Sequence, residues 1–344
     1  MNDQYTRGTE GLIHACLLAG AIGDSLGADI EFWDIEDISE EFPEGIHQLS
    51  TQASRGAGWF TDDTQMTLWT AEGLFQSEWG HSAGSQNTTT LVNSVHEALL
   101  LWLQTQNGRC PFEVRLKSPL LEDRRMWFEA APGTTCMSSL SQSPALGAQA
   151  SNDSKGCGSI MRVAPIALGL SREMVWDVAI ETSGLTHGHH TGKIAAAAWA
   201  NILSDILHGT TLDQAIQSAL DRCQCTKPND ANQETQTAIL SALAARQDGT
   251  SETVETLGEG WVAEEALSIA LYSALASGGS FERGLQIAVT HSGDSDSTGA
   301  IAGNLLGLLY PDQVFEHRWS IELGGSDLIA RSAKGLAELR QKSG

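Results

Sequence analysis

The residues best suited to chemistry stand in two clusters of carboxylates and hydroxyls that lie far apart in the sequence. The stretch 291–299, with Asp294 and Asp296, runs directly into an apolar helical pattern, and Thr61-Asp62-Asp63-Thr64 precedes a second such pattern at 65–75. Oxygens of Asp, Ser and Thr accept hydrogen bonds from the free amides of a first helical turn, so one such residue is an ordinary N-cap. Two clusters with several such groups each also suit Mg²⁺ or a similar ion, provided that the fold brings them together.

A third source of carboxylates is Glu31, which follows a glycine-containing turn. If it meets the Asp62–Asp63 and Asp294–Asp296 pairs, five ionised groups share one site, and desolvation and mutual repulsion oppose that arrangement. Two divalent cations would compensate the charge, and two-metal sites serve hydrolysis by binding substrate oxygens and activating water. Separate capping roles are the alternative. A calcium-sensor loop is excluded, because the position that requires Glu in such a loop is Leu305.

Three further features carry weaker signals. The Gly- and Ser-rich segment 152–162 has amides suited to a phosphate, with charge from Lys155, but it lacks Walker A spacing and a plain turn is the alternative. Residues 186–190 hold three imidazoles without the other ligands of a zinc site, which favours a single substrate contact or surface histidines. Cys157 has no basic activator in the sequence beyond Lys155, so covalent cysteine catalysis is a minor alternative.

Apolar residues recur at helical spacing through most of the chain, and alternating β-branched runs are nearly absent. This pattern predicts helices over 8–26, 65–75, 91–103, 174–182, 193–207, 212–223, 237–245, 263–276, 281–289, 298–309 and 328–339. We expect one all-α domain, with 32–58 as a long acidic loop. Gly299, Gly303 and Gly307 share one helix face and weaken that helix unless a neighbour packs tightly against them.

The composition limits the partners and the compartment. Twenty Lys and Arg against 43 Asp and Glu give a net charge of -23, which opposes binding to nucleic acid or to an anionic membrane. No apolar run is long enough to span a bilayer, and the first residues lack the features of a secretory signal. The six scattered cysteines fit neither a zinc site nor a disulfide scaffold, which favours reduced thiols and a cytoplasmic protein.

Taken together, these segments resemble the ADP-ribosylglycohydrolase family. The motifs that carry the resemblance are Gly20–Phe32, Trp59–Thr64, Ala131–Cys136, Ser154–Pro165, Thr186–His187 and Ser292–Gly299, in family order. The chain also departs from the family pattern. Ser297 stands where many members have Thr, which keeps the hydroxyl, whereas Cys157 replaces the Asn of several members and removes an amide hydrogen bond.

The resemblance implies a compact single-domain orthogonal helix bundle over residues 8–342, preceded by a tail, 1–7, with a binuclear Mg²⁺ or Mn²⁺ site. The implied metal ligands are Thr61, Asp62, Asp63, Asp294, Asp296 and Ser297. The implied catalytic carboxylates are Glu31, which matches a mobile acidic residue, and Asp62. The implied substrate-binding positions are Ser154, Lys155, Gly156, Cys157, Gly158 and Ser159, with His187 at the ribose.

The reaction that the resemblance implies is release of ADP-ribose from an ADP-ribosylated protein, which reverses an ADP-ribosyltransferase. Arginine is the expected modified side chain. One alternative keeps the site and changes the linkage, to serine or an O-acyl group. Another is a protein that binds and blocks an ADP-ribosyltransferase, which makes such a transferase a second candidate partner.

Overall fold

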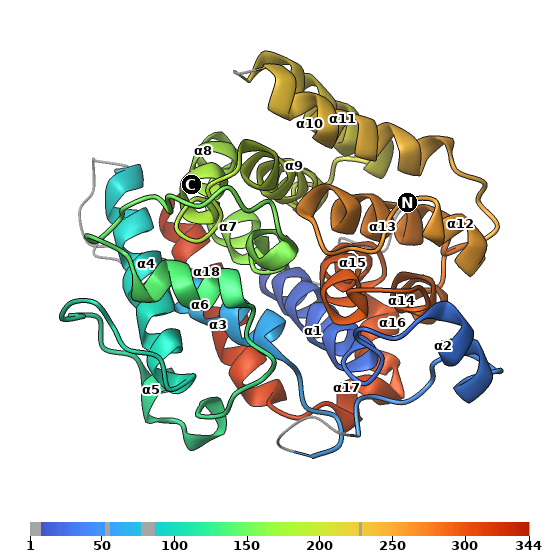
Figure 1. Ribbon diagram of the computed structural model, residues 1–344, viewed down its shortest axis with the longest axis horizontal. Helices are drawn as coiled ribbons and strands as arrows, with labels where there is room; N and C mark the ends of the chain where they lie inside the picture. Colours follow the sequence, from blue (N-terminus) through green and yellow to red (C-terminus); the bar gives the residue numbers. More distant parts are fainter. Residues whose placement is uncertain (1–7, 52–55, 77–86, 227–228, 344) are drawn as a thin grey trace.

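Two long helices, α1 (Thr9–Gly27) and α15 (Ser295–Leu309), lie at the centre of the molecule (Figure 1). The computed structural model describes residues 8–51, 56–76, 87–226 and 229–343. α1 and α15 make the most extensive helix–helix contact of that part of the chain, and both are buried over most of their length. The two helices therefore form the scaffold on which the other helices pack.

The glycine row of α15 faces α1. A Cβ atom added at Gly299, Gly303 or Gly307 would lie 2.3, 2.2 or 2.4 Å from a backbone carbonyl oxygen of α1. These separations are below any that real Cβ atoms adopt, so only glycine permits the observed approach. The expected tight packing against this row is confirmed, and the partner is α1.

The remaining helices surround this pair in groups that follow their contacts. On one side lie α3 (Asp62–Phe75), α4 (Thr88–Thr105), α7 (Ala164–Gly169), α8 (Arg172–Ser183) and α18 (Ser326–Ser343). On the other side lie α13 (Ala263–Ala276), α14 (Phe281–Val289) and α16 (Pro311–Glu316). Between them α9 (His190–Leu207) contacts both groups, and its outer side carries α10 (Leu212–Cys225) and α11 (Asn229–Ala244) at the edge of the molecule (Figure 1).

Every helix predicted from the apolar spacing is present, and α13 and α14 have the predicted bounds. The prediction of a structureless loop over 32–58 is wrong, because α2 (Ile35–Glu41) lies within it. Ile38 is the one buried residue of α2, so this short helix has no apolar period to detect. Other short elements were not predicted either, for the same reason: α5 (Pro119–Glu122), α6 (Thr134–Ser141), α7, α12 (Ser251–Glu255), α16, α17 (Arg318–Glu322) and the 3₁₀ turns η3 (Arg124–Met126) and η4 (Cys157–Ser159).

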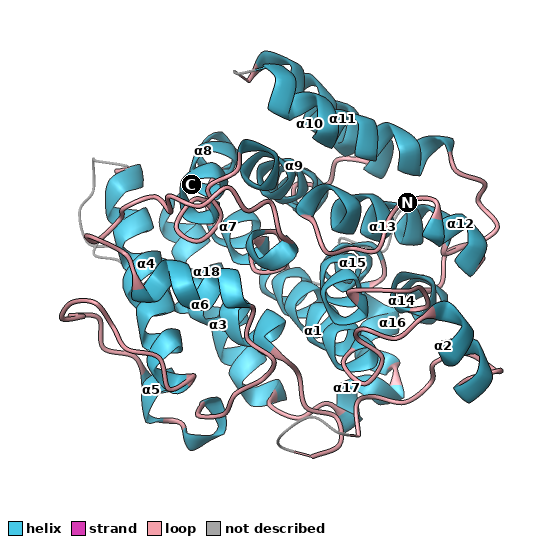
Figure 2. Ribbon diagram, in the orientation of Figure 1, coloured by secondary structure: helices cyan, strands magenta, loops and turns pink. Residues whose placement is uncertain are grey.

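Figure 2 shows helices joined by loops. Among the described residues the β pairing is limited to an isolated bridge between Gly156 and Val262. One continuous hydrophobic core extends from Ile13 to Leu339, so the expected all-α single domain is confirmed. No helix in this part of the chain is both long and apolar enough to cross a membrane. The expected tail, 1–7, and residues 52–55 of the acidic segment lie outside the described residues.

Candidate active site

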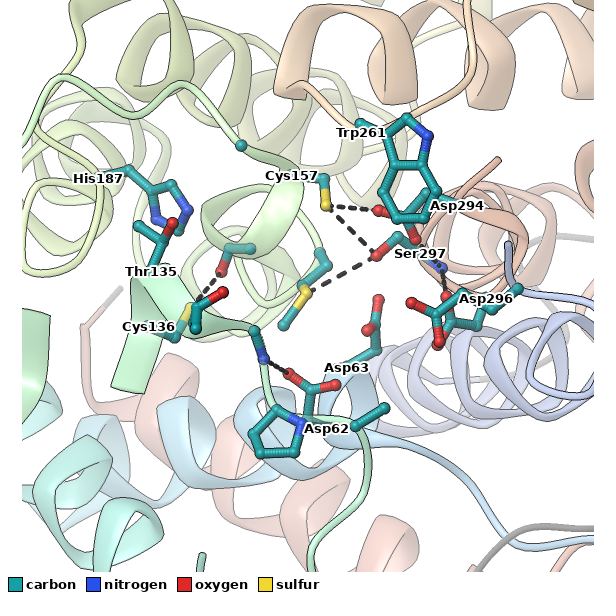
Figure 3. A pocket seen from close by; sticks show the side chains of 18 of the residues that line it. Asp62, Asp63, Thr135, Cys136, Cys157, His187, Trp261, Asp294, Asp296 and Ser297 are labelled. Carbon is teal, nitrogen blue, oxygen red and sulfur yellow. Dashed lines mark hydrogen bonds between the residues drawn. The ribbon is translucent and has the colours of Figure 1, made fainter. Parts of the chain in front are cut away.

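A pocket of about 360 Å³ opens where α3 and α15 begin. Asp62 and Asp63 form the first turn of α3, Asp294 is the N-cap of α15, and Asp296 lies in the first turn of α15. Glu31 reaches the same pocket from the turn that follows α1. The structure therefore brings all five predicted carboxylates together, as Figure 3 shows for the four aspartates.

The geometry of these carboxylates suits a cation. Oxygens of Glu31, Asp294 and Asp296 lie within 4.8 Å of one another. Asp63 Oδ1 is buried and has no hydrogen-bond partner among the described residues. Neither Lys nor Arg is among the described residues that line the pocket, so the protein supplies no positive side chain to offset the acids. An unpartnered buried oxygen among uncompensated carboxylates is the donor set that hard divalent ions prefer.

Burial and mutual repulsion disfavour the ionised forms of these acids. Burial, followed by the charges of Asp294 and Asp24, raises the pKa of Glu31 to about 8. For Asp62, Asp63 and Asp296 burial comes first and neighbouring carboxylates add to it, so the pKa of each lies well above its usual range. Without a cation the carboxylates therefore destabilise the fold as the pH rises and they ionise.

Added Mg²⁺ or Mn²⁺ is expected to raise the melting temperature of the EDTA-treated protein by several degrees at pH 7.5. A ligand at a hundred times its dissociation constant stabilises a fold by about 2.7 kcal/mol. Asp63→Asn removes one uncompensated charge, so this variant should melt higher than the wild type in EDTA and gain less from the ion. Differential scanning calorimetry of both proteins with and without ion checks this, and an equal gain in both would contradict it.

Asp24, a residue outside the predicted set, positions the Asp62–Asp63 turn. Its Oδ1 accepts a hydrogen bond from Thr61 N (2.8 Å), and its Oδ2 accepts bonds from Thr64 N (3.0 Å) and Thr64 Oγ1 (2.6 Å). Burial raises the pKa of Asp24 to about 6 against the effect of these bonds. This carboxylate of α1 caps α3, a role that the sequence did not indicate.

A buried cation, Arg162, holds the glycine-rich loop and His187. Its guanidinium donates to Gly158 O (3.2 Å) and to Thr186 Oγ1 (2.9 Å), and Thr186 Oγ1 lies 2.8 Å from His187 Nδ1. Burial and the charge of Arg162 lower the pKa of His187 to about 3, so the imidazole is neutral at physiological pH. A Cβ at Gly158 would lie 3.0 Å from His187 Cε1 and 2.9 Å from Cys136 Sγ, which explains the glycine there.

The thiol of Cys157 contacts the carboxylate cluster. Its Sγ donates to Asp294 Oδ2 (2.8 Å) and lies 3.6 Å from Ser297 Oγ. Burial and the charge of Asp294 raise the pKa of Cys157 well above its usual range. The protonated thiol is a poor nucleophile, which argues against covalent catalysis by this residue.

The predicted site residues divide into those that line the pocket and those that do not. Those that line it are Glu31, Asp62, Asp63, Gly156, Cys157, Gly158, His187, Asp294, Asp296 and Ser297, whereas Thr61, Ser154, Lys155 and Ser159 are not part of its wall. Lys155 Nζ is paired with Glu234 and Glu264. Ser159 is buried and its Oγ donates to Gly192 O, and Thr61 Oγ1 caps α3 by accepting from Asp63 N. The expected phosphate contact of Lys155 does not fit this geometry.

Two sets of pocket residues were not predicted. One is the start of α6, where Gly133, Thr134 and Thr135 line the wall and no side chain caps the helix. The motif Ala131–Cys136 covers this segment, but none of its residues was among the predicted site residues. The other set is Phe32 and Trp261, aromatic residues for which the sequence showed no chemical pattern.

Comparison with known proteins shows the family of this chain. The sequence profile of the ADP-ribosylglycohydrolase family matches residues 6–344. The chain belongs to the ADP-ribosylglycohydrolase family. It is therefore a hydrolase that acts on a glycosidic linkage, as the motifs implied.

Relatives of this ADP-ribosylglycohydrolase span most of its length at low identity. The ADP-ribosylarginine hydrolase Tri1 of Pseudomonas putida is 26% identical over 93% of this chain and 76% of its own. The ADP-ribosyl-[dinitrogen reductase] glycohydrolase of Rhodospirillum rubrum is 23% identical over 84% of this chain and 82% of its own. An uncharacterised protein of Archaeoglobus fulgidus is 27% identical over 95% and 96%.

A solved structure shares the fold. The ADP-ribosylglycohydrolase-related protein complex contains a chain that superposes with a TM-score of 0.63 and 21% identity, over 96% of this chain and 99% of that one. At this identity the likeness concerns the fold alone, and it agrees with the all-α architecture expected from the sequence.

Proposed function

We propose that this protein hydrolyses the N-glycosidic bond between ADP-ribose and an arginine side chain of a modified protein, with two divalent cations, Mg²⁺ or Mn²⁺, held by its carboxylates. The observation that carries the proposal is the cluster of buried, uncompensated acids that shares its pocket with the uncapped start of α6. The choice of arginine is supported by the name of one relative, an ADP-ribosylarginine hydrolase.

The wall opposite the carboxylates suits the diphosphate. The first turn of α6 lacks a side-chain cap, so its amides are available to an anion, and the helix dipole favours negative charge there. Gly156 and Gly158 border the same space without side chains. His187 adds a neutral ring to this wall. Together these groups replace the charge that Lys155 was expected to supply.

The terminal ribose then lies at the carboxylates, with Asp62, Asp63, Asp294, Asp296, Glu31 and the hydroxyls of Thr61 and Ser297 as the proposed ion ligands. Bound divalent ions supply positive charge that offsets these acids, orients sugar hydroxyls and polarises water. Ser297 Oγ lines the pocket and Thr61 lies behind it as the N-cap of α3, so the ligand role of Thr61 needs its hydroxyl to serve both functions.

The reaction needs a group that moves a proton. Water adds its oxygen to the anomeric carbon, the bond from that carbon to the guanidine nitrogen breaks, and the departing nitrogen gains a proton. The carboxylates of Asp62 and Glu31 line the pocket and are the proposed acceptors of the proton that water loses. Gly133 N approaches Asp62 Oδ2 at 3.5 Å and orients that carboxylate toward the α6 wall.

The deciding experiment measures release of ADP-ribose from arginine-, serine- and cysteine-modified proteins with Mg²⁺ or with EDTA. We expect ion-dependent release from the arginine linkage and none from Asp296→Ala, whose side chain lies in the carboxylate cluster. Release from the serine linkage alone would show that the substrate is ADP-ribosyl-serine and not ADP-ribosyl-arginine. Absence of release from every linkage would contradict the proposal and favour the transferase-blocking alternative.

A further inference from the structure

An aromatic pair stands beside the carboxylates at one end of the pocket. The rings of Phe32 and Trp261 stack with centroids 5.0 Å apart and planes 24° apart, and both residues line the pocket. Phe32 is 69% exposed, among the most exposed large apolar side chains of the described residues. Phe32 therefore leaves apolar ring surface uncovered where it lines the pocket.

Backbone hydrogen bonds hold this pair in place. Phe32 has φ +72°, a conformation that a non-glycine residue rarely adopts. Its N–H donates to Gly293 O (3.1 Å), which fixes it to the loop that leads to Asp294. Trp261 O accepts from Cys157 N (3.1 Å), which fixes the second ring to the glycine-rich loop. Phe32 and Trp261 are therefore each joined by a backbone hydrogen bond to a segment of the site, Phe32 to the loop before α15 and Trp261 to the glycine-rich loop.

Carboxylates surround the pair. Glu31 directly precedes Phe32, Asp294 shares the pocket wall, and Glu259 Oε2 accepts from Trp261 Nε1 (3.1 Å). Neither Lys nor Arg lines this space among the described residues. Aromatic faces flanked by acids attract planar cations, through the ring quadrupole and through direct charge attraction.

The aromatic pair lies on the side of the pocket toward which the arginine side chain, the group that leaves in the proposed reaction, would extend. Figure 3 shows Trp261 on the same side of the pocket as Asp294, opposite His187, Thr135 and Cys136. If the diphosphate lies at the α6 wall and the terminal ribose at the carboxylates, the group attached to the anomeric carbon extends toward Trp261. The adenine extends the other way, beyond the diphosphate.

We infer that Phe32 and Trp261 form a subsite for the guanidinium of the modified arginine and so select the arginine linkage. This inference rests on the proposed function, because it takes the orientation of ADP-ribose from it. The planar cation stacks on a ring face while Glu259, which accepts a hydrogen bond from Trp261 Nε1, balances its charge. A serine linkage presents no such cation and gains nothing from the pair.

The test compares arginine- and serine-linked ADP-ribosyl peptides with Phe32→Leu and Trp261→Leu, which keep apolar bulk but remove the ring. Loss of a partly desolvated cation–π contact should lower kcat/KM for the arginine peptide about tenfold. The dissociation constant of free ADP-ribose, measured by calorimetry, should stay unchanged. The matched variants Phe32→Tyr and Trp261→Phe keep a ring and should retain most of the arginine activity.

Three outcomes would overturn the inference. Wild-type kcat/KM on the arginine peptide in both leucine variants would show that the pair is not used, while leaving the proposed function intact. A fall in affinity for free ADP-ribose would assign the pair to the adenine or the sugar. An equal loss in the tyrosine and phenylalanine variants would indicate a structural role.

A binding measurement separates this inference from the proposed activity. In an Asp62→Ala background, calorimetry should show tighter binding of the arginine peptide than of the serine peptide, and Phe32→Leu should abolish that preference. The wild type could release no ADP-ribose while the variant still binds the arginine peptide more tightly than the serine peptide. That result would refute the proposed hydrolysis and support the guanidinium subsite. Equal binding of the two peptides would refute the subsite directly.

Discussion

Replacing Asp62 with alanine is expected to abolish ADP-ribose release while leaving the fold intact. Asp62 is buried at the start of α3, lines the pocket, and is both a proposed ion ligand and a proposed proton acceptor. Loss of a general base alone costs roughly 10²- to 10⁴-fold in rate, and loss of an ion ligand adds to that. The measurement is the initial rate of ADP-ribose release from an arginine-modified protein at saturating Mg²⁺.

The fold should survive this change because the buried carboxylate of Asp62 destabilises the folded protein when no cation is bound. Burial and the charges of Asp24 and Glu31 raise the pKa of Asp62 well above its usual range, so its ionised form is disfavoured without a cation. Circular dichroism should therefore match the wild type, and the melting temperature in EDTA should not fall. Glu36→Ala, an exposed acid in the first turn of α2, is the control and should keep full activity. Wild-type turnover by Asp62→Ala would refute the proposed mechanism.

Replacing Gly303 with alanine should destabilise the whole protein, although alanine is the better helix former. A Cβ there would lie 2.2 Å from Ala19 O and 2.9 Å from Gly20 Cα, both in the backbone of α1, which has no flexible end to move aside. Overpacking of this kind costs about 1–3 kcal/mol and more where backbone must shift. On propensity alone the same change would stabilise the helix by about 1 kcal/mol, so the sign of the effect tests the packing.

Thermal unfolding followed by circular dichroism checks this expectation. Gly8→Ala is the matched control, because a Cβ at Gly8 meets no atom within 4 Å. The control should melt close to the wild type and Gly303→Ala several degrees lower, or it should fail to accumulate as folded protein. A higher melting temperature for Gly303→Ala would contradict the close approach of α1 and α15.

The α1–α15 contact also shapes the site. Glu31 follows the end of α1, and Asp294 and Asp296 begin α15, so the glycine-lined approach of these helices brings the two segments to one place. A shift between the helices would separate Glu31 from the aspartates. We therefore expect partial loss of activity in any folded fraction of Gly303→Ala.

Much of this arrangement was predictable from local signals. The apolar period located the long helices because each buries one face, and the Asp, Ser and Thr clusters marked helix starts because their oxygens cap free amides. Short helices such as α2 and α6 contain too few turns for a period to emerge, which explains the error at 32–58 and why no helix was predicted at 134–141. The ion pairs of Lys155 were not predicted either, because its partners Glu234 and Glu264 lie 79 and 109 residues away in the sequence.

The sequence by itself determined the all-α class, the five carboxylates of the site and the family, since each depends on residue type and spacing along the chain. The tertiary structure alone decided which helices meet, that Asp24 caps α3, that Arg162 holds His187, and that Phe32 stacks on Trp261. These contacts join segments far apart in sequence, and their geometry depends on how closely the helix backbones pack. Local patterns specify which groups are present, whereas packing specifies which of them face one another.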